Sequence, residues 1–123
     1  MLLGVRNDKG YGDDPETLLN SRSGRIYLFP AAEEGVPLAF YKFQARGGFL
    51  VTASRNTHEV EYLEIESRRN IDCHLMNPWP GRPVVVRDVT KNRKIFVRTD
   101  KTNGECLVFA TISDHKYIIQ PKL

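Results

Sequence analysis

From residue 25 to the C-terminus, apolar and polar residues alternate with a period of two over short stretches. The clearest stretch is 60–67, where Leu63 and Ile65 are expected to point inward and Glu64 and Glu66 outward. Such alternation is typical of half-buried strands and not of helices. The pattern predicts strands over the segments 25–29, 38–45, 49–54, 60–67, 71–76, 84–89, 94–99, 105–111 and 116–120.

Turn signals separate these segments. Gly47-Gly48 marks a turn or bulge, Asn103-Gly104 is a strong hairpin signal, and the three prolines of 77–83 predict an irregular loop. About eight or nine short strands, spaced by turns, predict an all-β fold, an antiparallel β-sandwich of the jelly-roll-like type. Within the segment 38–45, simple alternation places Phe40 and Phe43 on opposite faces.

The N-terminal part follows a different pattern. Residues 1–13 are rich in Gly, Asn and Asp and predict a flexible arm, so the single sandwich domain is expected over 14–123. Asp14–Leu19 predicts one short helical turn, because Asp14 suits the N-cap and Pro15 the first helical position. The longest apolar run is the five residues 106–110, so neither a membrane span nor a signal peptide is expected.

Composition narrows the function only slightly. The chain has 123 residues and a net charge of +3, which suits one folded domain. Its densest basic cluster is Lys91–Lys94, with Arg87 and Arg98 nearby. We interpret this cluster as a solvated strand edge. A small basic β-domain that binds nucleic acid is the alternative.

No residue pattern predicts catalysis, a cofactor or a metal. Asp72 and His74 share a strand face, but the sequence supplies no third ligand. Cys73 and His74 point to opposite faces, which argues against a dyad. Cys73 and Cys106 are expected to be buried thiols, although one disulfide is the alternative. An independent small carbohydrate-active enzyme remains a further alternative.

Trp79 is the one tryptophan, and it lies in the proline-rich loop. A rigidly held indole can stack on a sugar ring, and Arg82 and His74 are candidates to bind carbohydrate with it. The competing interpretation is that Trp79 plugs the end of the sandwich or packs on a partner domain.

Several phrases in order resemble the C-terminal β-domain of glycoside hydrolase family ninety-five, the α-L-fucosidase-like enzymes. The resemblance covers about residues 16–110 and rests on five phrases: Thr17-Leu18-Leu19-Asn20-Ser21, Gly24-Arg25-Ile26-Tyr27-Leu28-Phe29-Pro30-Ala31, Phe43-Gln44-Ala45-Arg46-Gly47-Gly48-Phe49-Leu50-Val51, Glu64-Ile65-Glu66-Ser67 and Asn77-Pro78-Trp79. In that family the catalytic acid and base lie in a separate α/α barrel, so the resemblance implies no catalytic residue here.

The resemblance further implies a non-catalytic accessory module, structural or carbohydrate-contacting. Its expected partners are a glycoside hydrolase barrel or carbohydrate, and Arg46, Gly47 and Gly48 are the expected domain contact. A former barrel-facing surface that stays apolar would also favour a homo-oligomer. Family members are often exported, which leaves the compartment of this chain open.

Overall fold

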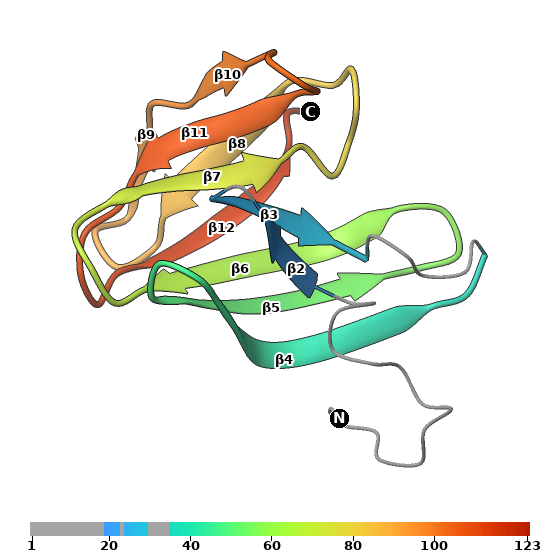
Figure 1. Cartoon of the computed structure of the whole chain (residues 1–123), viewed down its shortest axis with the longest axis horizontal. Coiled ribbons are helices and arrows are strands. Elements are labelled where there is room, and N and C mark those ends of the chain that lie inside the picture. The colour runs from blue at the N-terminus through green and yellow to red at the C-terminus, as the bar shows by residue number, and fades with distance from the viewer. Residues whose placement is uncertain (1–18, 23, 30–34) are drawn as a thin grey trace.

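The computed structural model describes residues 19–22, 24–29 and 35–123, and in this part the chain forms two β-sheets packed face to face (Figure 1). The first sheet has five strands in the order β10-β11-β7-β3-β2. Its strands are β2 (Leu19–Arg22), β3 (Arg25–Leu28), β7 (Asp72–Met76), β10 (Arg98–Asp100) and β11 (Cys106–Ala110).

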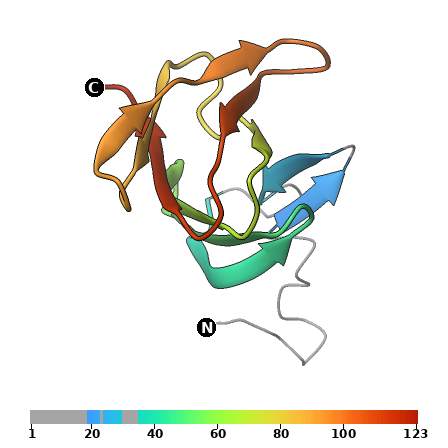
Figure 2. The ribbon, with the colours of Figure 1, turned by 90° about the vertical axis from the view of Figure 1, so that its left-hand side faces the viewer.

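The second sheet has six strands in the order β4-β5-β6-β12-β8-β9. Its strands are β4 (Leu38–Ala45), β5 (Phe49–Arg55), β6 (Val60–Ser67), β8 (Val84–Asp88), β9 (Arg93–Ile95) and β12 (Lys116–Pro121). Figure 2 shows the chain crossing between the sheets along the side that carries β9 and β10.

The predicted all-β sandwich is confirmed. All strand pairs are antiparallel except β3 and β7, which run parallel with Ile26 opposite Leu75. The described residues contain no helix long and apolar enough to cross a membrane.

The inward-facing positions of both sheets form the hydrophobic core. In β6, Leu63 and Ile65 are fully buried, as the alternation predicts. Cys73 and Cys106 are buried and unbridged, which confirms the prediction of two thiols. Other residues of the core are Ile26, Phe40, Phe49, Val51, Leu75, Trp79, Val86, Leu107, Phe109, Tyr117 and Ile119.

The prediction that Phe40 and Phe43 face opposite ways is wrong. The register between β4 and β5 shifts between these two residues, and Lys42 adopts φ 53°. This bulge adds a residue to one strand and returns Phe43 to the inner face. The two rings consequently stack with centroids 4.8 Å apart.

The strand boundaries differ from the prediction in two places. The segment predicted as one strand over 94–99 is divided into β9 and β10, which lie in different sheets. β2 was not predicted, because Ser21–Gly24 has turn chemistry and Gly24 does make the turn with φ +73°. The predicted helical turn lies outside the described residues except for Leu19, which belongs to β2. The predicted arm over 1–13 also lies outside them.

Candidate functional site

A pocket of about 380 Å³ opens at the end of the sandwich where β3, β5 and β7 finish and β6 begins. This volume falls at the lower end of the range for small-molecule sites, about 300–1000 Å³. Three segments distant in sequence supply its lining. They are the end of β3 (Leu28, Phe29), the β5–β6 turn and its flanks (Arg55, His58, Glu59, Val60), and the loop after β7 (Pro78, Trp79, Pro80, Arg82).

The loop after β7 is ordered by its own hydrogen bonds. The Asn77 side-chain oxygen accepts the backbone N–H of Trp79 at 2.8 Å, and the Trp79 carbonyl accepts the Arg82 N–H at 3.0 Å. The Glu105 carboxylate accepts the Gly81 N–H at 2.7 Å. Because prolines stiffen the same loop, the pocket wall is preorganised.

Trp79 is 3% exposed, and its indole Nε1–H donates to the Val60 carbonyl at 2.8 Å. The ring therefore plugs the end of the sandwich, as the competing interpretation had it, and forms the buried wall of the pocket. Its faces are not open for stacking on a sugar.

Polar side chains make the accessible rim of the pocket. Arg82 Nη1 and Glu59 Oε1 form an ion pair at 2.9 Å, and each side chain is about half exposed. His58 is exposed beside them. The Asn56 side-chain oxygen holds this turn by accepting the N–H groups of His58 and Glu59 at 2.7 and 2.9 Å.

Arg55 and Phe29 form the opposite wall. The Arg55 guanidinium lies 5.3 Å from the Phe29 ring centroid, and its Nη2 donates to the Val36 carbonyl at 2.7 Å. Phe29 is buried and has a left-handed φ of 52°, which turns the chain at the end of β3. The rim thus offers guanidinium donors, a carboxylate acceptor and an imidazole, a set that suits hydroxyl groups.

The three predicted carbohydrate residues are only partly brought together. Trp79 and Arg82 line the pocket, whereas His74 lies on β7 opposite Val108 and does not line it. Sequence reasoning missed Arg55, His58 and Glu59. The alternation of apolar and polar residues contains no signal that the turn at 56–59 meets a loop about twenty residues further along the chain.

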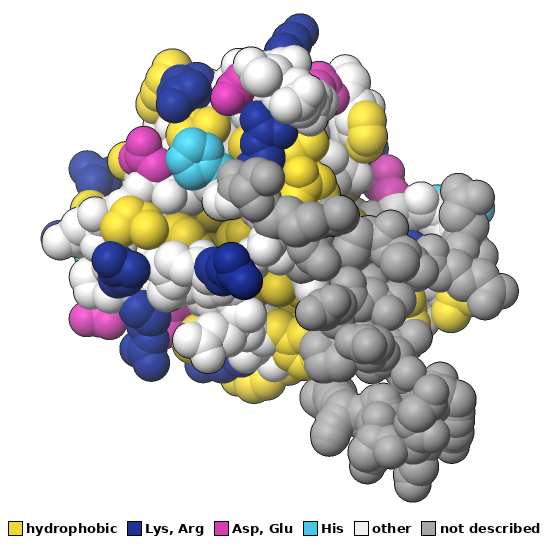
Figure 3. Space-filling view, in the orientation of Figure 1, with side chains coloured by type: hydrophobic (Ala, Val, Ile, Leu, Met, Phe, Trp, Pro, Cys, Tyr) yellow, Lys and Arg dark blue, Asp and Glu magenta, His cyan; other side chains and the backbone are white. Residues whose placement is uncertain are grey.

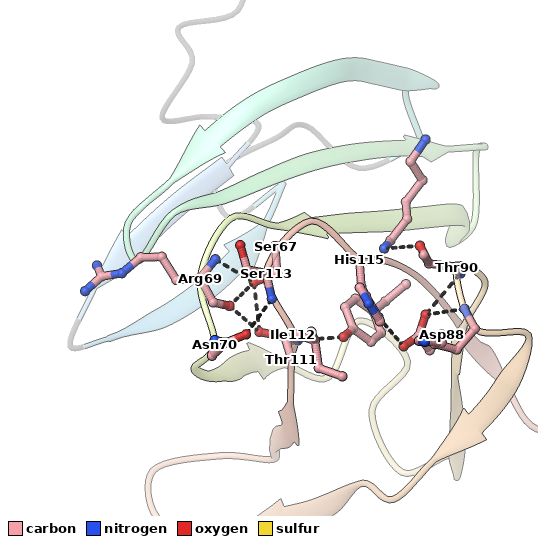
Figure 4. Close-up of polar contacts among 12 residues, drawn as sticks. Ser67, Arg69, Asn70, Asp88, Thr90, Thr111, Ile112, Ser113 and His115 are labelled. Atoms are coloured by element: carbon pink, nitrogen blue, oxygen red, sulfur yellow. Dashed lines mark hydrogen bonds and ion pairs between the residues drawn. The ribbon is translucent and has the colours of Figure 1, made fainter.

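A second polar cluster lies at the other end of β8. Asp88 is fully buried, and its Oδ2 accepts a hydrogen bond from His115 Nδ1 at 2.7 Å (Figure 4). Its Oδ1 accepts the backbone N–H groups of Thr90 and Lys91, both at 3.0 Å. Burial alone would raise the pKa of the Asp88 carboxyl, but the hydrogen bonds from His115, Lys91 and Thr90 outweigh it and lower that pKa.

This Asp–His pair is structural and lacks the nucleophile of a triad among the described residues. Figure 4 shows Ser67 and Ser113 beside the 67–71 turn, away from the His115 ring. Ser67 Oγ bonds to Thr111 Oγ1 at 2.8 Å, and Ser113 Oγ donates to the Arg68 carbonyl at 3.0 Å. The hydroxyls therefore fasten turns together and are not aligned for nucleophilic attack.

Glu64 and Glu66, two carboxylates on β6, are both occupied by contacts within the fold. Glu64 accepts the Tyr62 hydroxyl at 2.7 Å, and Glu66 lies 3.7 Å from Lys42 Nζ. Burial and the Glu64 carboxylate raise the pKa of Tyr62 to about 12. The described residues hold no group of three His, Cys, Asp or Glu placed to bind a metal ion.

The predicted domain contact forms the turn between β4 and β5, in which Gly47 and Gly48 are half-buried. Gly47 and Gly48 have φ of +95° and +85°, and a Cβ on Gly48 would lie 3.0 Å from the Arg69 side chain. The Gly48 carbonyl accepts the Arg68 N–H at 2.8 Å, so the two glycines allow close approach to the 68–71 turn. The Arg46 side chain is exposed next to this contact.

A scan of protein-family models finds none that matches this chain, and a search of curated proteins finds no match either.

Proposed function

We propose that this chain is a non-catalytic accessory β-sandwich module of the type found at the C-terminus of family ninety-five glycoside hydrolases. We further propose that it contacts carbohydrate through the pocket lined by Trp79, Arg82 and Glu59, here termed the end pocket. The observation that carries the proposal is the rim of this pocket. There the Glu59–Arg82 pair and His58 stand on a preorganised loop and turn around an open volume of about 380 Å³.

The rim fits a polyol better than a charged or an apolar ligand. The carboxylate and guanidinium of the 2.9 Å pair largely neutralise each other, yet each keeps hydrogen-bonding capacity toward solvent. A sugar offers adjacent hydroxyls that donate to such a carboxylate and accept from such a guanidinium. The pocket would thus hold one terminal sugar residue of a glycan.

The arrangement supports contact without hydrolysis. Hydrolysis of a glycosidic bond commonly needs two carboxyl groups about 5–10 Å apart across the bond. Glu59 is the one carboxylate among the described residues that line the pocket, and Arg82 neutralises it. The reaction of the parent family would take place in a barrel domain, with Arg46 exposed for contact at the β4–β5 turn.

The test is binding of fucosyl and galactosyl oligosaccharides to the full chain, followed by amide chemical shifts. We expect saturable shifts at residues 56–60 and 78–82. Glu59→Gln and Arg82→Gln should each weaken binding about tenfold, because each removes one charge-assisted hydrogen bond. Both side chains are half exposed, so the fold should persist in each variant.

His74→Gln is the matched control, since His74 was predicted with the same set but lies outside the pocket. Unchanged binding by this variant is expected. Shifts centred on β7, or no saturable binding, would reject the proposed site. Turnover of an aryl fucoside by the purified chain would reject the non-catalytic role.

A further inference from the structure

The positive charge of the chain is concentrated in one stretch, residues 84–104. This stretch contains six Lys and Arg residues and two Asp residues, a net +4, whereas the whole chain has +3. The remainder is therefore slightly acidic. The stretch contains β8, β9 and β10, and these strands lie along one side of the sandwich (Figures 1 and 2).

None of the cations of this stretch forms an ion pair among the described residues, although Arg98 interacts electrostatically with Asp100, two positions further along the chain. The ion pairs of the described chain involve Arg25, Lys42, Arg68, Arg82, His115 and Lys116 instead. Arg87 and Lys94 are directly opposite each other across the β8–β9 pair, on the outer face. Arg87 Nη2 donates to the Asn92 side-chain oxygen at 2.7 Å, which leaves its charge uncompensated.

An exposed aromatic ring lies among these charges. Phe96 is 80% exposed, whereas its neighbours Ile95 and Val97 pack partly against the core. Lys94 and Arg98, two positions before and after it, are exposed as well. In Figure 3, dark-blue basic and yellow apolar side chains lie along the upper margin, in the region of β10 in Figure 1, with magenta acidic side chains among them.

Protection of a sheet edge does not account for this combination. Charged residues, Lys above all, do prevent edge-to-edge association. An exposed phenylalanine in the connection between the two edge strands β9 and β10 works against that protection, because it adds an apolar contact point. Like charges that face each other across two strands also cost stability. A ligand that carries negative charge and an apolar face would compensate both features.

We infer that the surface formed by Arg87, Lys91, Lys94, Phe96 and Arg98, here termed the basic edge, binds an anionic polysaccharide. Sulfate or carboxylate groups of the polymer would meet the cations, and the C–H face of a sugar ring would pack on Phe96. The anionic character follows from the charges, and the choice of a carbohydrate polymer rests on the proposed function. The basic edge would hold the charged part of a glycan, and the end pocket would hold a neutral terminal sugar.

The experiment measures binding of dextran sulfate, unmodified dextran and single-stranded oligothymidylate to the full chain at several salt concentrations. We expect dextran sulfate to bind most tightly, with an affinity that falls steeply with salt because bound counterions are released. In the double variant Arg87→Gln/Lys94→Gln, the slope of log affinity against log salt should decrease by about two. Phe96→Ala should weaken binding several-fold without changing that slope.

Lys42→Gln is the matched control. It removes the same charge from β4, at the opposite edge of the same sheet, and Lys42 is already paired with Glu66. It should leave the affinity and the slope unchanged. A loss per removed charge equal to that of Arg87→Gln/Lys94→Gln would show only a response to net charge and would overturn the basic edge as a site.

Two further outcomes would overturn the inference. Tighter binding of oligothymidylate than of dextran sulfate would identify a nucleic acid as the partner. No salt-dependent binding of either polymer would leave the basic edge without an anionic ligand. Arg82→Gln distinguishes these failures from a failure of the end pocket, because it should leave dextran sulfate binding intact whatever it does to neutral oligosaccharides.

Discussion

The end pocket and the basic edge each combine an aromatic side chain with charged neighbours, but they differ in the burial of the ring and in the pairing of the charges. In the end pocket the aromatic ring is Trp79, 3% exposed and hydrogen-bonded, and the nearby charges of Glu59 and Arg82 are paired. On the basic edge the ring is Phe96, 80% exposed, and the cations beside it form no ion pair within the described chain.

The difference shows why residue type alone is a poor guide to a binding surface. Trp79 has the side chain expected of a sugar platform, but the loop that holds it also turns it into the core. Phe96 belongs to an alternating segment expected to be a strand, but the chain leaves one sheet for the other at this point. The first ring contributes to stability, and the second is available to a partner.

The largest expected effect is that of Trp79→Ala. Removing the buried indole leaves a cavity and an unsatisfied Val60 carbonyl, so unfolding should become easier by about 3–5 kcal/mol. Phe96→Ala should change the free energy of unfolding by less than about 0.5 kcal/mol, because the ring is exposed. Urea denaturation of both variants measures the contrast.

Trp79→Phe extends this measurement if the alanine variant does not fold. It keeps a ring in the core and loses the hydrogen bond to Val60, so its cost should be about 1–3 kcal/mol. Equal costs for the changes at Trp79 and Phe96 would break the comparison, since both rings would then be structural.

Asp88 connects the core to the basic edge, and its removal is the next largest effect. Asp88→Ala breaks the bond from His115 and the two bonds that hold Thr90 and Lys91, which should cost about 3 kcal/mol. The lowered pKa of Asp88 sets the pH range. Its contribution should be complete above the unfolded-state pKa of about 4 and should disappear as the pH falls through the native value.

Urea denaturation of the wild type and Asp88→Ala between about pH 7 and pH 3 tests this sign. The difference between the two proteins should be constant down to about pH 5 and should shrink below about pH 4. Asp114→Asn is the control, because Asp114 is largely exposed and pairs only at 3.8 Å with Arg68. A difference that grows toward acid pH would contradict the role assigned to the Asp88 carboxylate.

Local pattern predicted the sandwich and much of its core, because strand alternation is a property of neighbouring residues. Leu63 and Ile65 are examples that the structure confirms. The pattern did not reveal the bulge at Lys42. A bulge changes only which face of the sheet the following residues occupy, and the residue types around Lys42 do not mark where that change occurs. The pattern also did not show that the segment 94–99 is divided at Phe96. Apolar and polar residues alternate in the same way whether the two halves belong to one sheet or to two.

The candidate site was less accessible to such reasoning. Arg82 was found through its loop, but its partner Glu59 belongs to a turn on another strand. The Asp88–His115 pair is likewise separated by 27 positions. Contacts of this kind depend on which strands become neighbours, and strand order is decided by the packing of the whole sandwich.

The smallest effect distinguishes the charges of the basic edge from ordinary surface charge. Lys94 faces Arg87 across β8 and β9, so Lys94→Glu replaces a repulsion by an attraction. The free energy of unfolding should rise by about 0.5 kcal/mol at low salt, and the gain should fade as salt is added. Lys42→Glu should do the reverse, because Lys42 lies beside Glu66. Chemical denaturation of both variants at two salt concentrations is sufficient.

A higher free energy of unfolding for Lys94→Glu would mean that the chain keeps a destabilising cation at this position, as expected if the basic edge is retained for a ligand. A loss would mean that Lys94 is compensated within the fold, and the contrast with the paired charges of the end pocket would no longer hold.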